Sequence, residues 1–432
     1  MTPGARASAA IEVLADIEAR KRPASEALKD WGLAHRFAGS GDRAAIGNLV
    51  FDVLRKRASS AYAMGEDSPR ALVLRTLVTS WHNTPEEVAA LADGSRHAPE
   101  PLSEAELAGL KRESPVDAPA YVRGDYPEWL EPLFERAFGM RAGEEGGALA
   151  DRAPVDLRVN TLKATREKVL KALQRFSPIP TPLSPTGVRI QQAPGPGRSP
   201  HVEAEAGHGK GWYEVQDEGS QLAALLTGAK PRGQVIDLCA GAGGKTLALA
   251  ALMQNTGQLY AYDSDRMRLR PIFERLKRAG VRNAQVLAAG DAGALAEFGG
   301  KMDLVVIDAP CTGSGVWRRR PDAKWRLNPQ MLEARIKQQA EVLDEGAPLV
   351  KPGGRLAYIT CSVLPSENRD QVAAFLTRHR EFKLIPSRQL WEEGLPETPP
   401  RPSADGSEDT LLMTPLSHGT DGFFVAVLQC ER

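Results

Sequence analysis

Cysteine is scarce in this sequence, and no two cysteines stand close together. The 432 residues include four, at positions 239, 311, 361 and 430. None belongs to a C-x-x-C pair, so we expect no zinc site and no other bound metal. No apolar run reaches the ~20 residues of a membrane span, and no signal-peptide pattern follows Met1. We therefore expect a cytoplasmic protein with reduced thiols and no membrane partner.

Net charge is also lacking, because 55 Lys+Arg balance 55 Asp+Glu. Residues 1–150 hold 18 basic and 23 acidic side chains, which leaves the rest of the chain mildly positive. That asymmetry is too small to argue for nucleic acid binding by itself. The composition, with 42% hydrophobic residues, is that of a globular protein, and the length predicts two or three domains with substantial cores.

The first 140 residues show helical periodicity. Between Ile46 and Leu54 the apolar residues recur at i, i+3, i+4, i+7 and i+8, which is one face of a helix. Ser103 with Glu106 matches a capping box. We predict an all-helical domain over 1–120, acting either as a docking or stability module or as an RNA-binding module. The basic residues for the second role are Arg43, Arg55, Lys56 and Arg57.

The next region, 121–210, combines a strand pattern with a helix pattern. Residues 157–160 predict a strand, and Thr165 is placed to cap a helix behind it. A strand followed by a helix over this length predicts a small α+β subdomain. Another helix is expected near 212–226, carrying Leu222 toward the core. The remaining residues, 211–432, are predicted to form the catalytic domain.

A strand, a glycine-rich turn and a helix are predicted at 235–253. The apolar run at 235–238 suits a strand covered on both faces. Gly241, Gly243 and Gly244 remove Cβ atoms where backbone has to approach a ligand closely. The N–H groups at the start of the following helix suit a carboxylate or a phosphate.

From residue 230 onward, predicted strands alternate with helices. The strands are expected at 235–238, 258–262, 285–288, 304–308, 355–360 and 423–428. This alternation predicts an α/β domain with a doubly wound, parallel, Rossmann-like sheet. Ligands of such a sheet bind at the carboxyl ends of the strands. Asp263, Asp291, Asp308 and Cys361 all fall at such ends.

Asp263 lies 22 residues beyond Gly241, where a carboxylate can accept hydrogen bonds from ribose hydroxyls. The turn lacks the G-x-G-x-x-G spacing that a nicotinamide cofactor favours. It suits S-adenosylmethionine better, with the methionine end at the glycine turn, the ribose on Asp263 and the adenine near Asp291.

Two of the four cysteines follow predicted strands. Cys311 comes shortly after the strand at 304–308, and Cys361 follows the strand at 355–360. If these strands are neighbours, both thiols reach one cleft. Cys239 and Cys430 are expected to be small buried side chains without a catalytic role. The backbone of Cys239 can still line the cofactor site.

Three segments closely resemble the Sun (Fmu) family of S-adenosylmethionine-dependent RNA cytosine-5 methyltransferases. They are DLCAGAGGKT at 237–246, DAPCTGSG at 308–315 and TCSVLPSEN at 360–368. QDEGSQ at 216–221 and DGFF at 421–424 are also similar to that family, so the resemblance covers roughly 120–432. The N-terminal region resembles the NusB-type domain of the bacterial ribosomal-RNA branch. The family usually has Ala-Pro where this chain has Gly241-Ala242.

The resemblance implies methyl transfer to carbon 5 of a cytosine in RNA, with 16S ribosomal RNA as the expected substrate. It implies that Cys361 bonds to carbon 6 of the base, that Cys311 helps to release the product, and that Asp308 contacts both cytosine and cofactor. The S-adenosylmethionine site is expected to comprise Cys239, Ala240, Gly241, Ala242, Gly243, Gly244, Lys245, Asp263, Asp291 and Asp308. We expect the protein to act as a monomer.

A basic segment with two tryptophans, at 316–326, follows Cys311. It predicts a surface for RNA phosphates and base stacking, and the alternative is an ordinary basic loop. The RNA-binding residues expected here are Arg318, Arg319, Arg320, Lys324 and Arg326.

Two other functions remain as alternatives. The first is methylation of cytosine in transfer RNA, and the second is a non-catalytic, RNA-binding role in ribosome assembly. The sequence D-A-P-C at 308–311 argues against an amino-methyltransferase. A DNA cytosine methyltransferase would not need Cys361.

Overall fold

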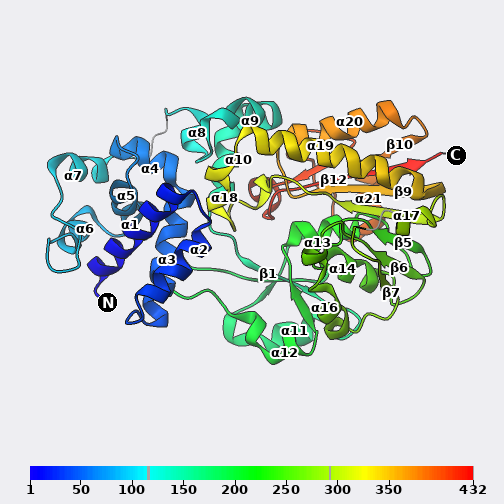
Figure 1. Cartoon of the computed structure of the whole chain (residues 1–432), viewed down its shortest axis with the longest axis horizontal. Helices are drawn as coiled ribbons and strands as arrows, with labels where there is room; N and C mark the ends of the chain where they lie inside the picture. The colour runs from blue at the N-terminus through cyan, green and yellow to red at the C-terminus, as the bar shows by residue number, and fades with distance from the viewer. Residues whose placement is uncertain (114–116, 291–292, 432) are drawn as a thin grey trace. The chain divides into compact units, whose positions relative to one another are not determined.

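The computed structural model describes residues 1–113, 117–290 and 293–431, and these residues form two compact units (Figure 1). Unit 1 comprises residues 1–153, 192–199 and 317–327. Unit 2 comprises residues 154–191, 200–316 and 328–432. Each unit is therefore built from stretches that are far apart in the sequence.

Unit 1 is helical in its described residues, as the periodicity predicts. Its helices are α1 (Pro3–Arg20), α2 (Ala24–Ala34), α3 (Ser40–Arg55), α4 (Arg57–Met64), α5 (Pro69–Thr79), α6 (Pro85–Leu91), α7 (Glu104–Lys111), α8 (Ala120–Arg123), α9 (Glu131–Phe138), α10 (Ala142–Leu149) and α18 (Pro321–Arg326). Ile46, Leu49 and Val53 lie on one face of α3 and are fully buried against α1 and α5. Ser103 and Glu106 form the predicted capping box at the start of α7.

Unit 2 contains a small antiparallel sheet. Its strands are β1 (Val155–Val159), β2 (Ile179–Pro180), β3 (Gly187–Ile190) and β4 (Tyr213–Val215), in the order β2-β3-β1-β4. The helices beside it are α11 (Arg166–Ala172), capped by Thr165 as predicted, and α12 (Ala206–Gly209). The prediction of a continuous helix near 212–226 is wrong at its start. Tyr213 pairs with Val159 in β4 and is fully buried, and the helix begins only at Glu218.

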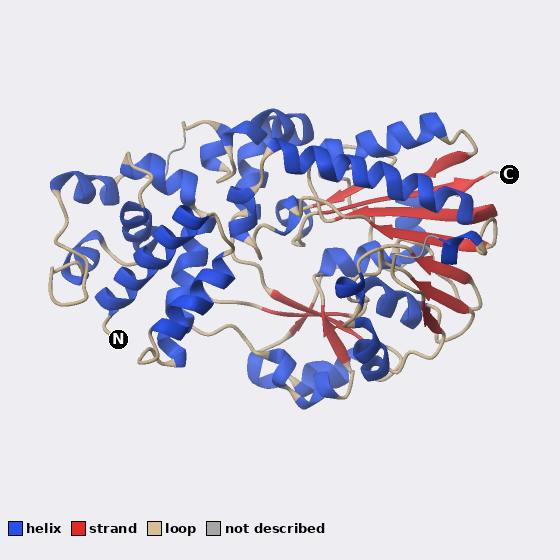
Figure 2. Cartoon of the chain, in the orientation of Figure 1, coloured by secondary structure: helices blue, strands red, loops and turns tan. Residues whose placement is uncertain are grey.

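The larger sheet of unit 2 carries the six strands expected from the sequence (Figure 2). Its strands are β5 (Gln234–Asp237), β6 (Gln258–Ala261), β7 (Ala284–Val286), β8 (Met302–Asp308), β9 (Val350–Thr360), β10 (Phe382–Ile385), β11 (Leu411–Met413) and β12 (Phe423–Cys430). The order is β10-β12-β9-β8-β5-β6-β7, with β11 beside β12. Strands β5 to β9 run parallel, whereas β12 pairs antiparallel with β9 and β10. The sheet is therefore mixed rather than wholly parallel.

Helices cover both faces of this sheet (Figure 1). The helices in this part of unit 2 are α13 (Glu218–Leu225), α14 (Gly244–Leu252), α15 (Arg266–Leu269), α16 (Ile272–Ala279), α17 (Gly293–Ala296), α19 (Pro329–Gly346), α20 (Arg369–Arg378), α21 (Ser387–Gly394) and α22 (Pro415–His418). Side chains alternate between the faces. Val306 packs into the core that α13, α14 and α21 share, while the neighbouring Ile307 faces α19. A Cβ on Gly346 of α19 would lie 2.8 Å from Ile307 Cδ1, so the helix lies directly on the sheet.

The strand order changes direction between β5 and β8. From β5 the chain continues to β6 and β7 on one side, and later returns to β8 and β9 on the other. Loops that leave the carboxyl ends of β5 and β8 therefore diverge, which is where open α/β sheets bind their ligands. The glycine turn follows β5, and Asp308 ends β8.

In the described part of the chain, no helix is both long enough and apolar enough to span a membrane.

Candidate active site

The glycine turn joins β5 to α14 in the predicted manner. Gly241 and Gly243 have φ of +49° and +86°, in the left-handed region that favours glycine. A Cβ on Gly243 would lie 2.6 Å from Ile272 Cγ1, so a larger residue would push α16 away. A Cβ on Gly241 would lie 3.6 Å from Arg268 Nη2 and 3.8 Å from Asp263 Oδ2, which are ordinary van der Waals contacts, so the positive φ rather than a lack of space favours glycine there.

Asp263 lies just beyond β6 and holds the glycine turn through its carboxylate. Its Oδ2 accepts from the Gly241 N–H at 2.9 Å, and its Oδ1 accepts from the Asp265 N–H at 2.8 Å. The side chain is 2% exposed, with Arg268 Nη1 3.8 Å from Oδ2. Each oxygen retains a lone pair, so each can still accept a hydrogen bond from a ribose hydroxyl. The predicted adenine contact, Asp291, lies outside the described residues.

Two further groups of the turn have pKa values shifted by burial. Asp237, at the end of β5, is fully buried, and burial raises the pKa of its carboxyl to about 7. Its Oδ2 accepts from Thr246 Oγ1 at 2.6 Å. Burial raises the pKa of Cys239 well above its usual range. The side chain of Cys239 is partly exposed and not buried as expected. A thiol with a raised pKa is a poor nucleophile, which is consistent with Cys239 as a lining residue of the turn.

The two cysteines that follow β8 and β9 lie together. These strands are adjacent and parallel, and the Sγ atoms of Cys311 and Cys361 are 3.3 Å apart. Both side chains are partly exposed. The hydrogen bond with Cys361, together with burial, raises the pKa of Cys311 well above its usual range. Either thiol can donate its S–H to the sulfur of the other.

The loops that carry these cysteines are hydrogen-bonded along their length. The Gly315 N–H donates to the Cys361 carbonyl oxygen at 2.9 Å. Ser314 Oγ lies 2.9 Å from Ser362 Oγ and also accepts from the Val363 N–H at 2.9 Å. The two thiols are thus fixed relative to each other by backbone as well as side chains.

Glu367 is hydrogen-bonded to both of these loops, and it was not among the predicted site residues. Its carboxylate is fully buried and accepts from the Thr312 N–H at 2.8 Å, Thr312 Oγ1 at 2.5 Å, Ser362 Oγ at 2.5 Å and Gln339 Nε2 at 3.0 Å. Thr312 and Ser362 directly follow the two cysteines. Burial raises the pKa of Glu367 in spite of these donors.

A polar chain connects Asp308 with the small sheet. Lys245 is 3% exposed, and its Nζ lies 3.2 Å from Asp308 Oδ2 and 2.8 Å from Ser220 Oγ. Ser220 in turn accepts from Gln216 Nε2 at 3.1 Å. Arg158 of β1 donates to Gln216 Oε1 at 2.8 Å and to the Gly244 carbonyl oxygen at 3.0 Å. Asp308, which is 32% exposed, is therefore oriented by a buried cation.

The basic segment after Cys311 belongs to unit 1, and its residues differ in exposure. Arg318 is buried, Arg319 is half-buried, and Arg320 is exposed. Arg326 is exposed and pairs with Asp322 at 3.0 Å. Lys324 is 1% exposed and donates to the Arg55 carbonyl oxygen at 3.1 Å, which gives it a packing role in this conformation.

The tryptophans of this segment are packed within unit 1 rather than presented for base stacking. Trp317 is 2% exposed and stacks on Phe134 with ring centroids 6.0 Å apart. Trp325 is half-buried, and its Nε1 donates to the Leu54 carbonyl oxygen at 2.6 Å. Burial of Trp317 between helices therefore removes it from the predicted stacking surface.

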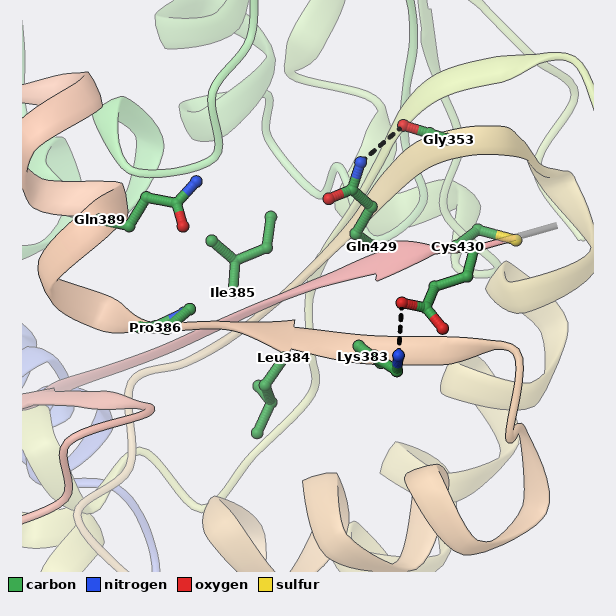
Figure 3. A pocket seen from close by; sticks show the side chains of 9 residues that line it. Gly353, Lys383, Leu384, Ile385, Pro386, Gln389, Gln429 and Cys430 are labelled. Atoms are coloured by element: carbon green, nitrogen blue, oxygen red, sulfur yellow. Dashed lines mark hydrogen bonds and ion pairs between the residues drawn. The ribbon is translucent and has the colours of Figure 1, made fainter.

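A surface pocket of about 490 Å³ lies at the opposite end of β9 from Cys361 (Figure 3). It is formed by β10, the start of β9 and the end of β12, where Gln429 Nε2 donates to the Gly353 carbonyl oxygen and Lys383 pairs with Glu431. Cys430 also lines it and is buried, as expected. Across the described ranges, no group of three His, Cys, Asp or Glu side chains is arranged to hold a metal ion.

Comparison with known families matches two parts of the chain. Residues 224–429 match the family described as 16S rRNA methyltransferase RsmB/F. Residues 126–195 match the ferredoxin-like domain of RsmF/B-like methyltransferases, which corresponds to the small sheet with β1 and β3.

Individual proteins are also similar. The chain is 35% identical over 307 residues to ribosomal RNA small subunit methyltransferase B of Salmonella typhi, covering 70% of this chain and 66% of that protein. The chain thus spans about two thirds of that relative's length. The crystal structure of PH0851 superposes with a TM-score of 0.72, 26% identity and 99% coverage of both chains. A methyltransferase homolog from Pyrococcus horikoshii gives a TM-score of 0.59 and 27% identity, over 72% of this chain and 97% of that one.

Proposed function

Because the chain belongs to the RsmB/F family of 16S ribosomal RNA methyltransferases, we propose that it methylates carbon 5 of a cytosine in RNA through a covalent cysteine adduct. The proposed substrate is 16S ribosomal RNA, and S-adenosylmethionine is the cofactor of this family. The observation that carries the proposal is the pair of thiols 3.3 Å apart at the carboxyl ends of the adjacent strands β8 and β9.

The residues of the glycine turn fit S-adenosylmethionine. The N-terminus of the nine-residue helix α14 would hold the carboxylate of its methionine end. Asp263 would accept the ribose hydroxyls with the lone pairs that Gly241 and Asp265 leave free. When bound, the cofactor supplies a methyl group attached to a sulfonium, so that a neutral thioether would be the leaving group.

The thiols supply what cytosine lacks. Carbon 5 of cytosine is a weak nucleophile. When the Cys361 thiolate adds to carbon 6, a sulfur–carbon bond forms, and the electron pair of the 5,6 double bond becomes available at carbon 5 for the methyl group. Loss of the carbon 5 proton then returns the pair to the ring, and the sulfur–carbon bond breaks to release Cys361.

The contact between the two thiols supports these roles. The hydrogen bond with Cys361, together with burial, raises the pKa of Cys311, and an S–H on Cys311 would stabilise a negative charge on the Cys361 sulfur 3.3 Å away. The same contact lets Cys311 assist release of the adduct. Asp308, oriented by Lys245, is the carboxylate available to contact the base. The target cytosine has to be unpaired or flipped out to reach both thiols.

The two variants that each lack one thiol should be blocked at different steps of the reaction. Cys361→Ala should abolish methylation and give no covalent protein–RNA species. Cys311→Ala should add to the base and transfer methyl but stall before release. A denaturing gel of each variant with RNA and S-adenosylmethionine should therefore show a slow-migrating band for Cys311→Ala only. A band for Cys361→Ala alone would reverse the roles, and full activity in both variants would refute the covalent route.

The identity of the RNA needs a separate measurement. Bisulfite mapping of cellular RNA with and without the protein should reveal one protein-dependent 5-methylcytosine in 16S ribosomal RNA. A protein-dependent site found only in transfer RNA would contradict the proposed substrate while leaving the chemistry intact.

A further inference from the structure

Two carbonyl oxygens of the glycine turn are held by arginine side chains. The Ala242 carbonyl oxygen accepts from Arg275 Nη1 at 2.8 Å. The Gly244 carbonyl oxygen accepts from Arg158 Nη1 at 3.0 Å. These two carbonyl groups stand on either side of Gly243, whose φ is +86°. The arginines therefore fix the backbone around the glycine that gives the turn its shape.

Both arginines depend on the small antiparallel sheet. Arg158 belongs to β1, and Glu214 lies directly opposite it in β4. The Glu214 side chain is 4% exposed, and its Oε2 accepts from Arg275 Nη2 at 3.0 Å and from Arg275 Nε at 3.3 Å. Arg278 Nη2 donates to both oxygens of the same carboxylate, at 2.6 Å and 2.7 Å. Burial opposes ionisation of Glu214, but the hydrogen bonds and charges of Arg278 and Arg275 lower the pKa of its carboxyl, so it is charged at neutral pH.

The Arg275 guanidinium bridges the small sheet and the glycine turn. Its Nε and Nη2 pair with Glu214, and its Nη1 donates to Ala242. Because the guanidinium is planar and rigid, the pair with the carboxylate sets the direction in which Nη1 donates. Arg278 lies on the next turn of α16 and shares the attachment to Glu214, whereas the bond to the glycine turn comes from Arg275.

We propose that Arg275, oriented by Glu214, is a positioning residue that holds the glycine turn in the conformation that binds S-adenosylmethionine. The inference rests on the proposed function, since it takes the cofactor to lie at this turn. Three of the four residues at 241–244 are glycines, and glycine loses more conformational freedom on ordering than any other residue. A contact that orders the turn before the cofactor arrives removes this cost from binding.

The matched pair of variants is Arg275→Met and Arg278→Met. Each takes one arginine away from Glu214, but only Arg275→Met removes the bond to Ala242. Calorimetry of the full-length protein with S-adenosylmethionine should show about tenfold weaker binding for Arg275→Met, because a hydrogen bond from a charged donor is lost. Arg278→Met should stay within about twofold of the wild type. Equal losses in the two variants would make Arg275 an attachment of α16 only and would overturn the proposal.

The order of the turn can be measured without cofactor. Hydrogen exchange, followed by mass spectrometry on a peptide that spans the glycine turn, should be faster in Arg275→Met than in the wild type, because the turn opens more often. Exchange in Arg278→Met should match the wild type. If Arg275→Met is folded by circular dichroism and equals the wild type in both exchange and cofactor affinity, the proposal is refuted.

Two milder variants test the same contact from either side. Glu214→Gln keeps Arg275 but weakens the pair that orients it, so cofactor affinity should fall and exchange of the turn should quicken. Arg275→Lys keeps the charge and lacks the planar fork, so its affinity should lie between those of the wild type and Arg275→Met. Wild-type affinity in both Glu214→Gln and Arg275→Lys would contradict a role for the oriented guanidinium.

Two comparisons separate this proposal from the proposed function. If Asp263→Ala weakens cofactor binding and Arg275→Met does not, the cofactor lies at the turn and Arg275 does not position it. If Arg275→Met weakens cofactor binding and the wild type methylates no RNA, the proposed function fails and the positioning role stands. In methylation assays Arg275→Met should raise KM for S-adenosylmethionine and leave kcat at saturating cofactor unchanged, since the contact serves the ground state and the transition state alike.

Discussion

Glu367 offers a direct test of how the two thiols are held. Replacing it by alanine removes the acceptor of four hydrogen bonds, two of them from Thr312 and one from Ser362, the residues that follow the cysteines. Glu367 acts on the thiols through the hydrogen bonds it accepts from Thr312 and Ser362, so it is a positioning residue. The matched change is Glu367→Gln, which keeps the shape of the side chain and removes only its ability to carry charge.

The expected cost follows from these contacts. Each buried donor that loses its acceptor costs about 1–3 kcal/mol. The hydroxyls of Thr312 and Ser362 can turn elsewhere, Ser362 toward Ser314 at 2.9 Å, and the alanine variant no longer buries a carboxylate. We therefore expect Glu367→Ala to lower the free energy of unfolding by about 3 kcal/mol. In Glu367→Gln the amide oxygen keeps the Thr312 and Gln339 bonds and both hydroxyls accept from the NH2 group, for a cost of about 1 kcal/mol or less.

The raised pKa of Glu367 adds a pH signature. Its folded form holds a proton where the unfolded chain, with a pKa of about 4.3, has lost it. Its contribution to stability is therefore complete below about pH 4.3 and is lost as pH rises through the folded pKa. Glu367→Gln has no such titration, so its free energy of unfolding should fall less than that of the wild type between pH 4.5 and 8. Urea denaturation at several pH values measures this difference.

Thiol position can be measured without RNA. Diamide accepts two electrons and two protons from a pair of thiols and leaves a disulfide, and Sγ atoms 3.3 Å apart should react rapidly. Glu367→Ala should slow this reaction and lower kcat while leaving S-adenosylmethionine affinity unchanged, and Glu367→Gln should restore both rates. If Glu367→Ala unfolds at the same urea concentration as the wild type and forms the disulfide as fast, the carboxylate does not hold the loops.

Two further predictions concern the cofactor site and the buried lysine. Asp263→Ala should weaken S-adenosylmethionine binding about 10–100-fold in calorimetry, because it loses the ribose acceptor and loosens the turn at Gly241; unchanged affinity would place the ribose elsewhere. Glu392→Ala, exposed on α21, is its control. Burial lowers the pKa of Lys324 to about 7, so the folded amine is neutral where the unfolded one is still protonated. Stability should therefore rise with pH from about 7 to about 10, by up to about 1.4 kcal/mol per pH unit. Lys324→Met should abolish that rise, and parallel stability curves for the two proteins would contradict it.

The strands around the site were predictable because each is a short apolar run with a polar residue at its carboxyl end. This pattern locates β5, β8 and β9 and places Cys311 and Cys361 at adjacent strand ends. Strands β10 and β11 escaped prediction, and both are defined by antiparallel pairing with β12, which is distant in sequence. Strand β4 was hidden in a helical pattern because tertiary pairing with β1 decides its conformation.

The residues that support the site could not be found in the same way. Glu367, Ser220 and Arg158 act through partners 55, 25 and 86 positions away, which only the folded chain brings together. Local sequence reports their polarity and not their contacts. Burial of Trp317 was equally invisible, because an aromatic residue in a basic segment suits a stacking surface as well as a core.

The discontinuous make-up of unit 1 has a consequence for synthesis. Residues 317–327 leave the ribosome well after residue 153, at about 5–20 residues per second an interval of roughly 10–35 s. During that interval the carbonyl oxygens of Leu54 and Arg55 lack the donors that Trp325 and Lys324 later bring. The domain that begins first is thus completed only after strands β5 to β8 have emerged. The end of α3 is the surface that a nascent chain has to protect until then.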